Sequence, residues 1–246
     1  MAAVGEGSEH GRELLAIVVA RNEVATIGPV LSGLPTTVEG HPLRRLVVDD
    51  GSTDQTAAVA RANAAEVISH PVGLGLGAAL RSGLDLARER GVDAAIYLDG
   101  DGEYDPRQAA RLLDPILAGR ADYVLGSRFL GSRQGMAWHR ALFNRWLSRL
   151  VGLLTSVHTT DAQTGYRAFS ARAVECARIR HDYNSAQVLT LSLWGAGIDP
   201  IEVPIDYERR AHGTSFIRHG EYLRRVAPAL LAEWRESRLR RRALER

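Results

Sequence analysis

The sequence contains no lysine, so all 31 of its basic side chains are arginine. An acid pair such as Asp49 and Asp50 after an apolar run is typical of a phospho-receiver domain, but that chemistry needs a lysine and is therefore excluded. Cys176 is the single cysteine, which excludes a disulfide framework and a cysteine metal cluster. The eight histidines show no metal-ligand spacing, and we expect them to be surface or core residues.

Long apolar runs are also missing. No run approaches the roughly 18 residues that a membrane-spanning helix needs. Residues 1–12 are small and polar, without the apolar core of a signal peptide. We therefore expect a flexible N-terminus over residues 1–12 and a cytoplasmic protein, which can also lie on the inner face of the membrane as a peripheral protein.

Charge is unevenly distributed along the chain. The net charge is +2, yet residues 216–246 carry nine arginines against four glutamates, which leaves the remainder slightly acidic. This asymmetry indicates a basic tail that meets an anionic surface. Nucleic acid is a poor candidate for that surface, because the rest of the chain is acidic and no aromatic platform is visible. We therefore expect no nucleic-acid partner.

Short apolar runs alternate with helical segments along most of the chain. The runs predict strands at 14–20, 43–48, 66–69, 94–99, 122–126, 165–169 and 198–207. The segments between them predict helices at 24–34, 77–90, 136–157 and 185–194, and a further helix after Pro106. Another predicted helix is capped by Ser52 or Thr53 and runs to residue 63. The last begins at 217, with Pro228 as a break or restart. This alternation predicts an α/β protein with a mostly parallel, doubly wound sheet.

The most informative segment is 97–106, which reads YLDGDGEYDP. Asp99, Asp101 and Glu103 occupy alternate positions, and residues two apart in an extended segment point the same way. Three converging carboxylates repel one another unless a cation lies among them, and their oxygens suit Mg²⁺ or Mn²⁺. The glycines between them allow a diphosphate to approach the backbone. The alternative is an ordinary acidic surface turn.

The position of the acids decides between these readings. Ligands bind outside the carboxyl ends of the strands in parallel sheets. Glu23, Asp49, Asp50, Asp99 and Asp101 all fall just after predicted strands. The glycines of segment 73–78 fit a relaxed dinucleotide fingerprint, but they belong to the third strand–helix unit and carry little weight.

Residues 136–157 predict a long amphipathic helix with a broad apolar arc, and Arg145 and Arg149 lie off that arc. Such a helix can lie in a membrane surface, and the basic tail adds attraction to anionic lipid. The alternative is a helix packed on the protein core. The sequence leaves both open. We expect C-terminal amphipathic helices in either case.

Four motifs in order resemble the inverting family 2 glycosyltransferases with the GT-A fold. Segment 18–23 reads VVARNE and is similar to their first-strand motif. Segment 47–54 reads VVDDGSTD, their most recognisable signature, and segment 75–83 resembles their glycine-rich turn. Asp99 and Asp101 stand where these enzymes carry the metal-binding D-x-D. The resemblance implies a GT-A catalytic domain over 13–215, followed by a basic helical tail over 216–246.

Later motifs resemble the polyprenyl-phosphate branch, which is typified by dolichol-phosphate mannose synthase. They are GSRF at 126–129, DAQTGYR at 161–167 and YERRAHGTS at 207–215, and Glu103 occupies the place of a metal-side glutamine. The family often has a lysine after the last of these, where this chain has Phe216. The resemblance implies transfer of a hexose, mannose or glucose, from GDP-mannose or UDP-glucose to a polyprenyl phosphate.

The same resemblance implies roles for individual residues. Asp99, Asp101 and Glu103 would bind Mg²⁺ or Mn²⁺, and the donor would contact Ala20, Asn22, Glu23, Asp50, Gly77, Arg81 and Gly100. The acceptor phosphate would contact Arg128, Arg140, Arg210 and Ser215, and the catalytic set would be Asp161, Arg128 and Arg210. Asp161 would orient Arg167 or Arg210, or would be the base for a hydroxyl acceptor.

Two rival functions stay open. One is a glycosyltransferase that acts on a soluble hydroxyl acceptor such as a secondary metabolite, which the Phe216 departure favours. The other is a non-catalytic module that binds a nucleotide sugar. The sequence does not fix the oligomeric state, and a homo-oligomer is compatible with it.

Overall fold

The computed structural model describes residues 11–155, 157–182, 186–208 and 219–246. Its central strand is β1, Leu14–Ala20, in which all seven residues are buried. A continuous apolar run of this kind is typical of a parallel strand covered on both faces. The predicted strand at 14–20 is confirmed, and the rest of the sheet is built outward from it.

The main sheet has eight strands in the order β2-β3-β1-β5-β8-β6-β9, with β4 paired to β3. β1 pairs in parallel with both β3 and β5, whereas β8 runs antiparallel between β5 and β6. Within the described residues, a second sheet pairs β7 with β10. The remaining strands are β2 Thr37–Val38, β3 His41–Asp49, β4 Glu66–Ser69, β5 Ala94–Asp99, β6 Tyr123–Ser127, β7 Arg133–Gln134, β8 Arg167–Ser170, β9 Ile201–Pro204 and β10 Tyr207–Glu208. The predicted mostly parallel sheet is confirmed.

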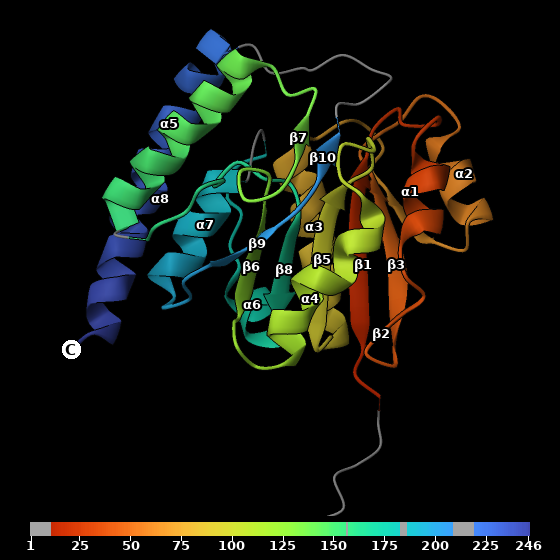
Figure 1. Ribbon diagram of the computed structural model, residues 1–246, viewed down its shortest axis with the longest axis horizontal. Coiled ribbons are helices and arrows are strands. Elements are labelled where there is room, and N and C mark those ends of the chain that lie inside the picture. The colour runs from red at the N-terminus through yellow and green to blue at the C-terminus, as the bar shows by residue number, and fades with distance from the viewer. Residues whose placement is uncertain (1–10, 156, 183–185, 209–218) are drawn as a thin grey trace, which may run out of the picture.

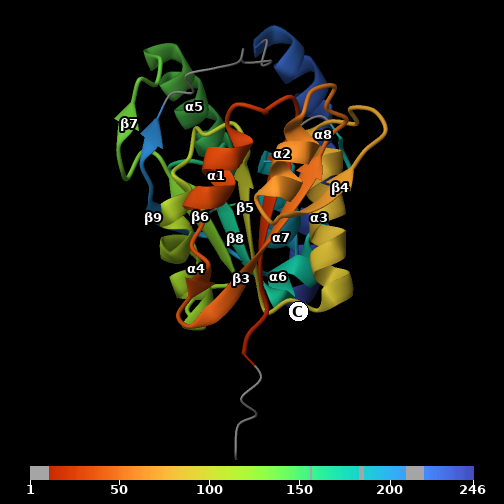
Figure 2. The same cartoon turned by 90° about the vertical axis from the view of Figure 1, so that its right-hand side faces the viewer.

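Helices cover both faces of the main sheet (Figures 1 and 2). One hydrophobic cluster joins the sheet to α1, α2 and α4, and a second joins the opposite face to α3, α6 and α7. This arrangement is the doubly wound architecture that the sequence predicts. The helices are α1 Ile27–Gly33, α2 Thr56–Ala62, α3 Leu76–Arg90, a 3-10 turn at Pro106–Gln108, α4 Ala109–Leu117, α5 Trp138–Thr155, α6 Ala171–Cys176, α7 Ala186–Gly195 and α8 His219–Leu244.

Helices α5 and α8 lie along one flank of the molecule, on the side opposite α1 and α2 (Figure 1). Leu147 of α5, Leu191 of α7 and Leu230 of α8 form a small hydrophobic cluster of their own. Trp234 of α8 donates a hydrogen bond from its indole Nε1 to the carbonyl oxygen of Leu154 at 2.8 Å. Helix α7 is buried from Gln187 onward, because it lies between the sheet and these outer helices.

Several local predictions differ from the structure. Ser52 and Thr53 do not cap α2, which begins at Thr56, because both face the turn after β1. The single strand predicted at 198–207 is two short strands in different sheets, β9 and β10. Pro228 neither breaks nor restarts the last helix, since α8 continues through it. The predicted boundary at 216 falls outside the described residues.

In the described part of the chain, no helix combines the length and the apolar character that crossing a bilayer requires. Helix α8 instead packs on α7 with polar side chains in the contact. Glu233 and Ser237 are buried there, and Glu233 accepts hydrogen bonds from Ser237 and Arg240. Arg241 pairs with Asp199, which lies four residues beyond the end of α7. Part of the charge on the tail is therefore used to fix the helix on the domain.

Replacing Gly195 with alanine should destabilise the packing of α8. A Cβ atom at Gly195 would lie 2.6 Å from the Cα atom of Ser237, so the two helices would have to separate. We expect Gly195→Ala to lower the free energy of unfolding by about 1–3 kcal/mol. Thermal unfolding followed by circular dichroism measures this loss.

Gly28→Ala in α1 is the matched control for this substitution. Its Cβ would meet Val59 at 3.4 Å and Asn63 at 3.5 Å, which are ordinary contacts. Alanine also favours helix more than glycine does, so this variant should be as stable as the parent or slightly more stable. An unchanged melting temperature for Gly195→Ala would contradict the tight packing of α7 and α8.

Candidate active site

The register of the central strands brings the predicted donor residues to one edge of the sheet. Ala20 at the end of β1 pairs with Asp49 at the end of β3, and Val19 pairs with Asp99 at the end of β5. The backbone amide of Asp50 donates to the carbonyl oxygen of Ala20 at 2.9 Å. Polar and acidic side chains therefore gather where three neighbouring strands end, which is the usual ligand position in such sheets.

Asn22 connects the turn after β1 to the turn after β3. Its backbone has a positive φ of 55°, which asparagine tolerates better than most residues. Its backbone amide donates to the hydroxyl of Ser52 at 2.9 Å, and its side-chain oxygen accepts from the backbone amide of Thr53 at 2.8 Å. The two turns thus form one rigid wall of the site.

Asp50 is buried and organises the glycine-rich segment before α3. Its carboxylate accepts hydrogen bonds from the amides of Leu74 and Gly75, both at 2.8 Å, and lies 2.8 Å from Nδ1 of His70. Burial opposes the negative charge, but the hydrogen bonds from His70, Leu74 and Gly75 lower the pKa of Asp50 below its ordinary value. The other ring nitrogen of His70 lies 3.0 Å from the hydroxyl of Ser82 on α3.

Gly100 is a point of close approach between β1, α1 and the acidic turn. A Cβ atom there would lie 3.1 Å from the Cβ of Ala20 and 3.2 Å from a side-chain carbon of Ile27. Thr26 donates its hydroxyl to the carbonyl oxygen of Gly100 at 2.8 Å and contacts the Glu23 carboxylate at 3.1 Å. Ala20, Glu23 and Gly100 therefore lie together, next to Asn22 and Asp50.

Gly77 and Arg81 have different partners from those expected. The amide of Gly77 donates to the carbonyl oxygen of Asp182 at 2.7 Å, and a Cβ atom on Gly77 would collide with the carbonyl oxygen of His181. Arg81 donates to the carbonyl oxygen of Ile179 and pairs with the carboxylate of Asp182 at 2.7 Å. In the structure both residues hold segment 179–182 on α3, rather than presenting open donors to a diphosphate.

The three acids of the 97–106 segment do not converge. Strand β5 ends at Asp99, and Gly102 has a φ of +75°, so the chain turns instead of remaining extended. Asp101 accepts a hydrogen bond from the amide of Glu103 at 2.9 Å, and Asp99 accepts one from the hydroxyl of Tyr97. Among the described residues no group of three or more His, Cys, Asp or Glu could hold a metal ion. The prediction of three converging carboxylates is wrong.

Glu103 is paired with an arginine that was expected to bind the acceptor. The guanidinium of Arg140, in the first turn of α5, donates to both carboxylate oxygens of Glu103 at 3.0 and 3.1 Å and to the hydroxyl of Tyr207 at 3.0 Å. Burial lowers the pKa of Arg140, but the hydrogen bond and charge of Glu103 outweigh it and the pKa is raised. Burial and Glu103 also raise the pKa of Tyr207, so its hydroxyl stays protonated near neutral pH.

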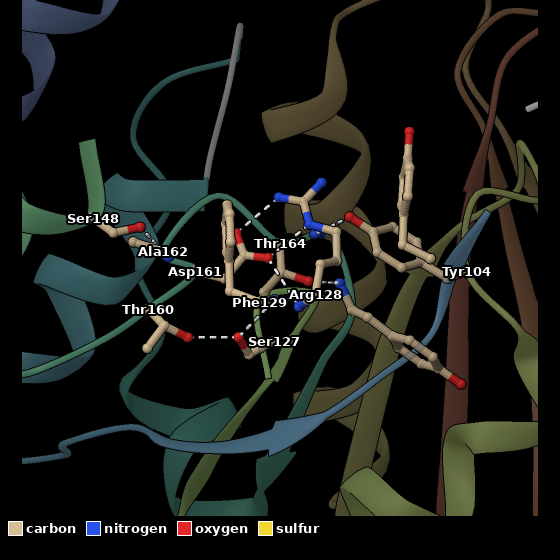
Figure 3. A network of polar contacts seen from close by, with 12 residues as sticks. Tyr104, Ser127, Arg128, Phe129, Ser148, Thr160, Asp161, Ala162 and Thr164 are labelled. Carbon is tan, nitrogen blue, oxygen red and sulfur yellow. Dashed lines mark hydrogen bonds and ion pairs between the residues drawn. The ribbon is translucent and has the colours of Figure 1, made fainter. Parts of the chain in front are cut away.

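Arg128 forms a second ion pair, with Asp161 (Figure 3). Its Nε and Nη2 atoms donate to the two carboxylate oxygens of Asp161 at 2.6 and 2.8 Å, and its backbone amide donates to the same carboxylate. The side chains of Arg128 and Asp161 are 2% and 0% exposed. Burial disfavours the charged guanidinium, but Tyr104 and Asp161 more than compensate and raise the pKa of Arg128.

Asp161 does not orient Arg167, and this alternative is wrong. The guanidinium of Arg167 donates to the carbonyl oxygens of Ala162, Thr164 and Ala186. The backbone at Asp161 is held in turn by Glu202, which accepts from the amides of Thr160 and Asp161. Arg210 and Ser215, which were predicted to bind the acceptor phosphate, lie outside the described residues.

Sequence reasoning missed three residues that shape this region. His70 was expected to be an ordinary surface or core residue, although its position just after β4 matches that of the other strand-end residues. Tyr207 lies in a recognised motif but received no role, and both Arg128 and Arg140 have their guanidinium carbon 5.6 Å from its ring centre. Glu202 carries no local signal, because its partners lie about forty residues earlier.

Comparison with known proteins identifies the family. The model described as "Glycosyl transferase family 2" matches residues 15–178. The chain is 32% identical to polyprenol monophosphomannose synthase of Mycolicibacterium smegmatis over 77% of its own length and 75% of that protein. It is 31% identical to undecaprenyl-phosphate mannosyltransferase of Micrococcus luteus over 84% of this chain and 88% of the relative.

Solved structures agree on the fold. Glucosyl-3-phosphoglycerate synthase from Mycobacterium tuberculosis, crystallised with Mn²⁺, uridine diphosphate and glucosyl-3-phosphoglycerate, aligns with a TM-score of 0.71 at 20% identity. The alignment covers 95% of this chain and 86% of that one. The GT-A fold predicted from the motifs is confirmed. The family match begins in β1 and ends beyond α6, and it shows together with the two relatives that this chain belongs to glycosyl transferase family 2 and is a glycosyltransferase.

Proposed function

We propose that this glycosyltransferase moves a hexose from a nucleoside-diphosphate sugar to a polyprenyl phosphate, with inversion at the sugar. The observation that carries the proposal is the pair Arg128 and Arg140, which flank the ring of Tyr207 beside the turn of Asp99 and Asp101. Guanidinium groups bind phosphate through paired donors. The names of the two mannosyl-transferring relatives support the same acceptor class.

The donor would lie along the ends of β3, β1 and β5. Asn22 and Asp50 form the wall that would face the base and ribose, and the close approach at Gly100, next to Ala20 and Glu23, would let the diphosphate reach the backbone. GDP-mannose and UDP-glucose both remain candidate donors. The mannosyl relatives favour the first, and the nucleotide in the mycobacterial crystal complexes favours the second.

Asp99 and Asp101 fit a divalent metal without a third acid. Mg²⁺ usually binds one or two carboxylates together with the phosphates of a substrate and several waters. Asp99 ends a strand and Asp101 follows in the turn, so both lie at the strand edge where the diphosphate is expected. When bound, Mg²⁺ or Mn²⁺ would supply positive charge that stabilises the departing nucleoside diphosphate. Because Glu103 pairs with Arg140, we assign the metal to the two aspartates.

A phosphate acceptor removes the need for a strong base. A phosphate monoester is largely ionised at neutral pH, so its oxygen can attack the sugar carbon directly. Asp161 is enclosed and bonded to Arg128 through both oxygens, so it is poorly placed to accept a proton from an acceptor. We therefore propose that Asp161 positions Arg128. The sequence and the relatives left open whether Asp161 is a base or a structural residue.

Purified protein with Mn²⁺ and labelled GDP-mannose or UDP-glucose should transfer sugar to a polyprenyl phosphate. Asp101→Asn should lower turnover by a factor of at least about 100, because a metal ligand is lost while the amide oxygen can still accept from Glu103. Extraction of labelled lipid measures the product.

Transfer only to soluble alcohols would support the rival hydroxyl acceptor. Absence of transfer and of donor hydrolysis would support a non-catalytic module, and full activity of Asp101→Asn would remove the proposed metal role.

Asp161→Asn should destabilise the fold by about 3–5 kcal/mol, because it leaves the Arg128 guanidinium enclosed without a negative partner. The double variant Arg128→Met/Asp161→Leu removes both charges and should recover most of that loss. Urea unfolding measures both. If Asp161→Asn lost activity without any loss of stability, the proposed positioning of Arg128 by an enclosed ion pair would be contradicted.

We also propose that the enzyme meets its lipid acceptor through the outer faces of α5 and α8. On α5, the outer face carries Trp138 and Leu153, which are 77% and 84% exposed, together with exposed Leu142 and Trp146. Aromatic and aliphatic side chains of this kind favour the interface of a bilayer. Asn144, Leu147 and Val151 point the other way and are buried. The sequence left open whether this helix packs on the core or lies in a membrane surface. In this proposal it does both, because one face packs on the protein and the other face is exposed.

Positive charge predominates on these outer faces, and the partly exposed Glu236 of α8 is paired with Arg180. Helix α5 contains no acid, and Arg145 and Arg149 lie exposed between its apolar residues. On α8 the exposed residues include Arg235, Arg238 and Arg242. A second copy of the chain would bring these arginines face to face, whereas an anionic lipid surface complements them. A lipid surface is therefore the better partner.

Vesicles of phosphatidylcholine with one part in about three of phosphatidylglycerol, and no polyprenyl phosphate, test this surface by flotation. We expect Trp138→Ser/Leu153→Ser and Arg235→Gln/Arg242→Gln each to weaken binding by about tenfold or more, with a steep loss at high salt. The matched controls are Val72→Ser, an exposed residue in the loop between β4 and α3, and Arg61→Gln, an exposed residue of α2, which lies on the flank opposite α5 and α8 (Figure 1). Equal loss in the controls would contradict the surface. The proposed surface would also be contradicted if the protein did not bind vesicles and instead formed a dimer that the Trp138→Ser/Leu153→Ser variant dissociates.

A further inference from the structure

Each of the two arginines beside Tyr207 already holds a carboxylate of this chain. Arg128 holds Asp161, and Arg140 holds Glu103. In each pair, the guanidinium donates to both oxygens of the carboxylate, and the two opposite charges cancel. An acceptor phosphate that enters this region therefore meets arginines whose charge is already compensated, and it must compete with one of the two carboxylates.

The two pairs differ in how accessible they are. The side chain of Arg140 is 29% exposed, whereas that of Arg128 is 2% exposed. A ligand from solvent or from a lipid surface therefore reaches Arg140 first. Arg140 also belongs to α5, two residues after the exposed Trp138, so it lies at the edge of the site that faces the outer helices.

The two carboxylates also differ in how firmly they are held. Asp161 receives three hydrogen bonds from Arg128, and its own backbone amide is fixed by Glu202. Glu103 receives two hydrogen bonds from Arg140; its side chain is 5% exposed, and its backbone bonds to the Asp101 carboxylate and to the amide of Glu208. Rotation of the longer Glu103 side chain would release Arg140, whose guanidinium is partly open to solvent, without breaking the enclosed pair. Glu103 is thus the carboxylate that can yield.

We propose that Glu103 is an internal competitor for the acceptor: its carboxylate occupies Arg140 in the resting protein, and the acceptor phosphate binds by displacing it. This inference rests on the proposed phosphate acceptor. A phosphate monoester carries about −1.5 to −2 charges at neutral pH and outcompetes a single carboxylate for a guanidinium. A neutral hydroxyl acceptor cannot make this exchange, so Glu103 selects for a doubly charged phosphate.

Glutamine at position 103 tests the competition, because Glu103→Gln removes the charge but keeps the size and one acceptor for Arg140. Binding of farnesyl phosphate is measured by calorimetry in EDTA without donor, so that neither metal nor turnover contributes. We expect Glu103→Gln to bind it about tenfold more tightly than the parent. Arg140→Gln should bind about tenfold or more weakly, because it lacks the guanidinium.

Asp105→Asn is the matched control, since it removes one negative charge from the same turn. Asp105 pairs with Arg107 rather than Arg140, and an asparagine oxygen can still accept from the Arg107 amide. Its affinity should stay within about twofold of the parent. The proposal is overturned if Glu103→Gln binds no more tightly than the parent, if Asp105→Asn gains as much, or if no variant binds the probe.

Failure of this inference and failure of the proposed function give different results. A parent enzyme that glycosylates polyprenyl phosphate while Glu103→Gln gains no affinity retains its function and loses the competitor. A parent that transfers sugar only to soluble alcohols, while Glu103→Gln binds farnesyl phosphate more tightly, loses the proposed acceptor but keeps the exchange at Arg140.

Discussion

The parallel register of β3, β1 and β5 is the constraint on which the site depends. Strands β1 and β5 are apolar and buried up to their carboxyl ends, and β3 is buried from Leu46 to Asp49, so near this edge of the sheet the acidic residues lie where the strands end. Register then aligns Ala20 with Asp49 and Val19 with Asp99, which puts three turns within hydrogen-bonding distance of each other. The bonds from Asn22 to Thr53 and from Thr26 to Gly100 follow from that alignment. A slip of register would separate these turns, however favourable each one is locally.

Charge compensation inside the chain is the second organising principle. An acidic strand-end turn suggests an excess of negative charge that only a cation can relieve. The structure supplies part of that relief itself, through Arg140 on Glu103 and Arg128 on Asp161. In a region of low dielectric constant, each isolated charge would be strongly disfavoured, so the pairs fix where the guanidinium groups lie. The proposed metal site therefore contains two acids, Asp99 and Asp101, instead of the three that the sequence pattern predicts.

The features that could be predicted from the sequence are those with a local signal. Strands such as β1 and β5 are apolar runs bounded by polar residues, and the alternation of elements indicates the doubly wound sheet. The motifs of segments 18–23 and 47–54 lead directly to the family. Convergence of Asp99, Asp101 and Glu103 failed because the rule of alternate positions requires an extended backbone, and Gly102 turns the chain.

The features that escaped prediction depend on contacts between distant segments. Arg140 and Glu103 are 37 positions apart, and Arg81 and Asp182 are 101 apart. No periodicity records such a pairing, because it arises only when helices and turns pack. The expected helix caps failed for a related reason, since Ser52 and Thr53 bond to Asn22 across the strand edge. Tertiary contacts of this kind outweigh a local capping preference of about 1 kcal/mol.

Helix α5 connects the outside of the protein to the site. Its first turn carries Arg140 into contact with Glu103, while Trp138 in the same turn is exposed. Its buried face packs on α7 and α8, so the helix cannot rotate to exchange these roles. If the outer face of α5 binds a bilayer, the distance between Arg140 and the lipid headgroups is therefore fixed. A lipid phosphate would then have to rise only to this accessible guanidinium, while its hydrocarbon chain stays in the bilayer. On this proposal, the enzyme would reach a membrane-bound acceptor from the bilayer surface, and none of its described helices is long and apolar enough to cross a membrane.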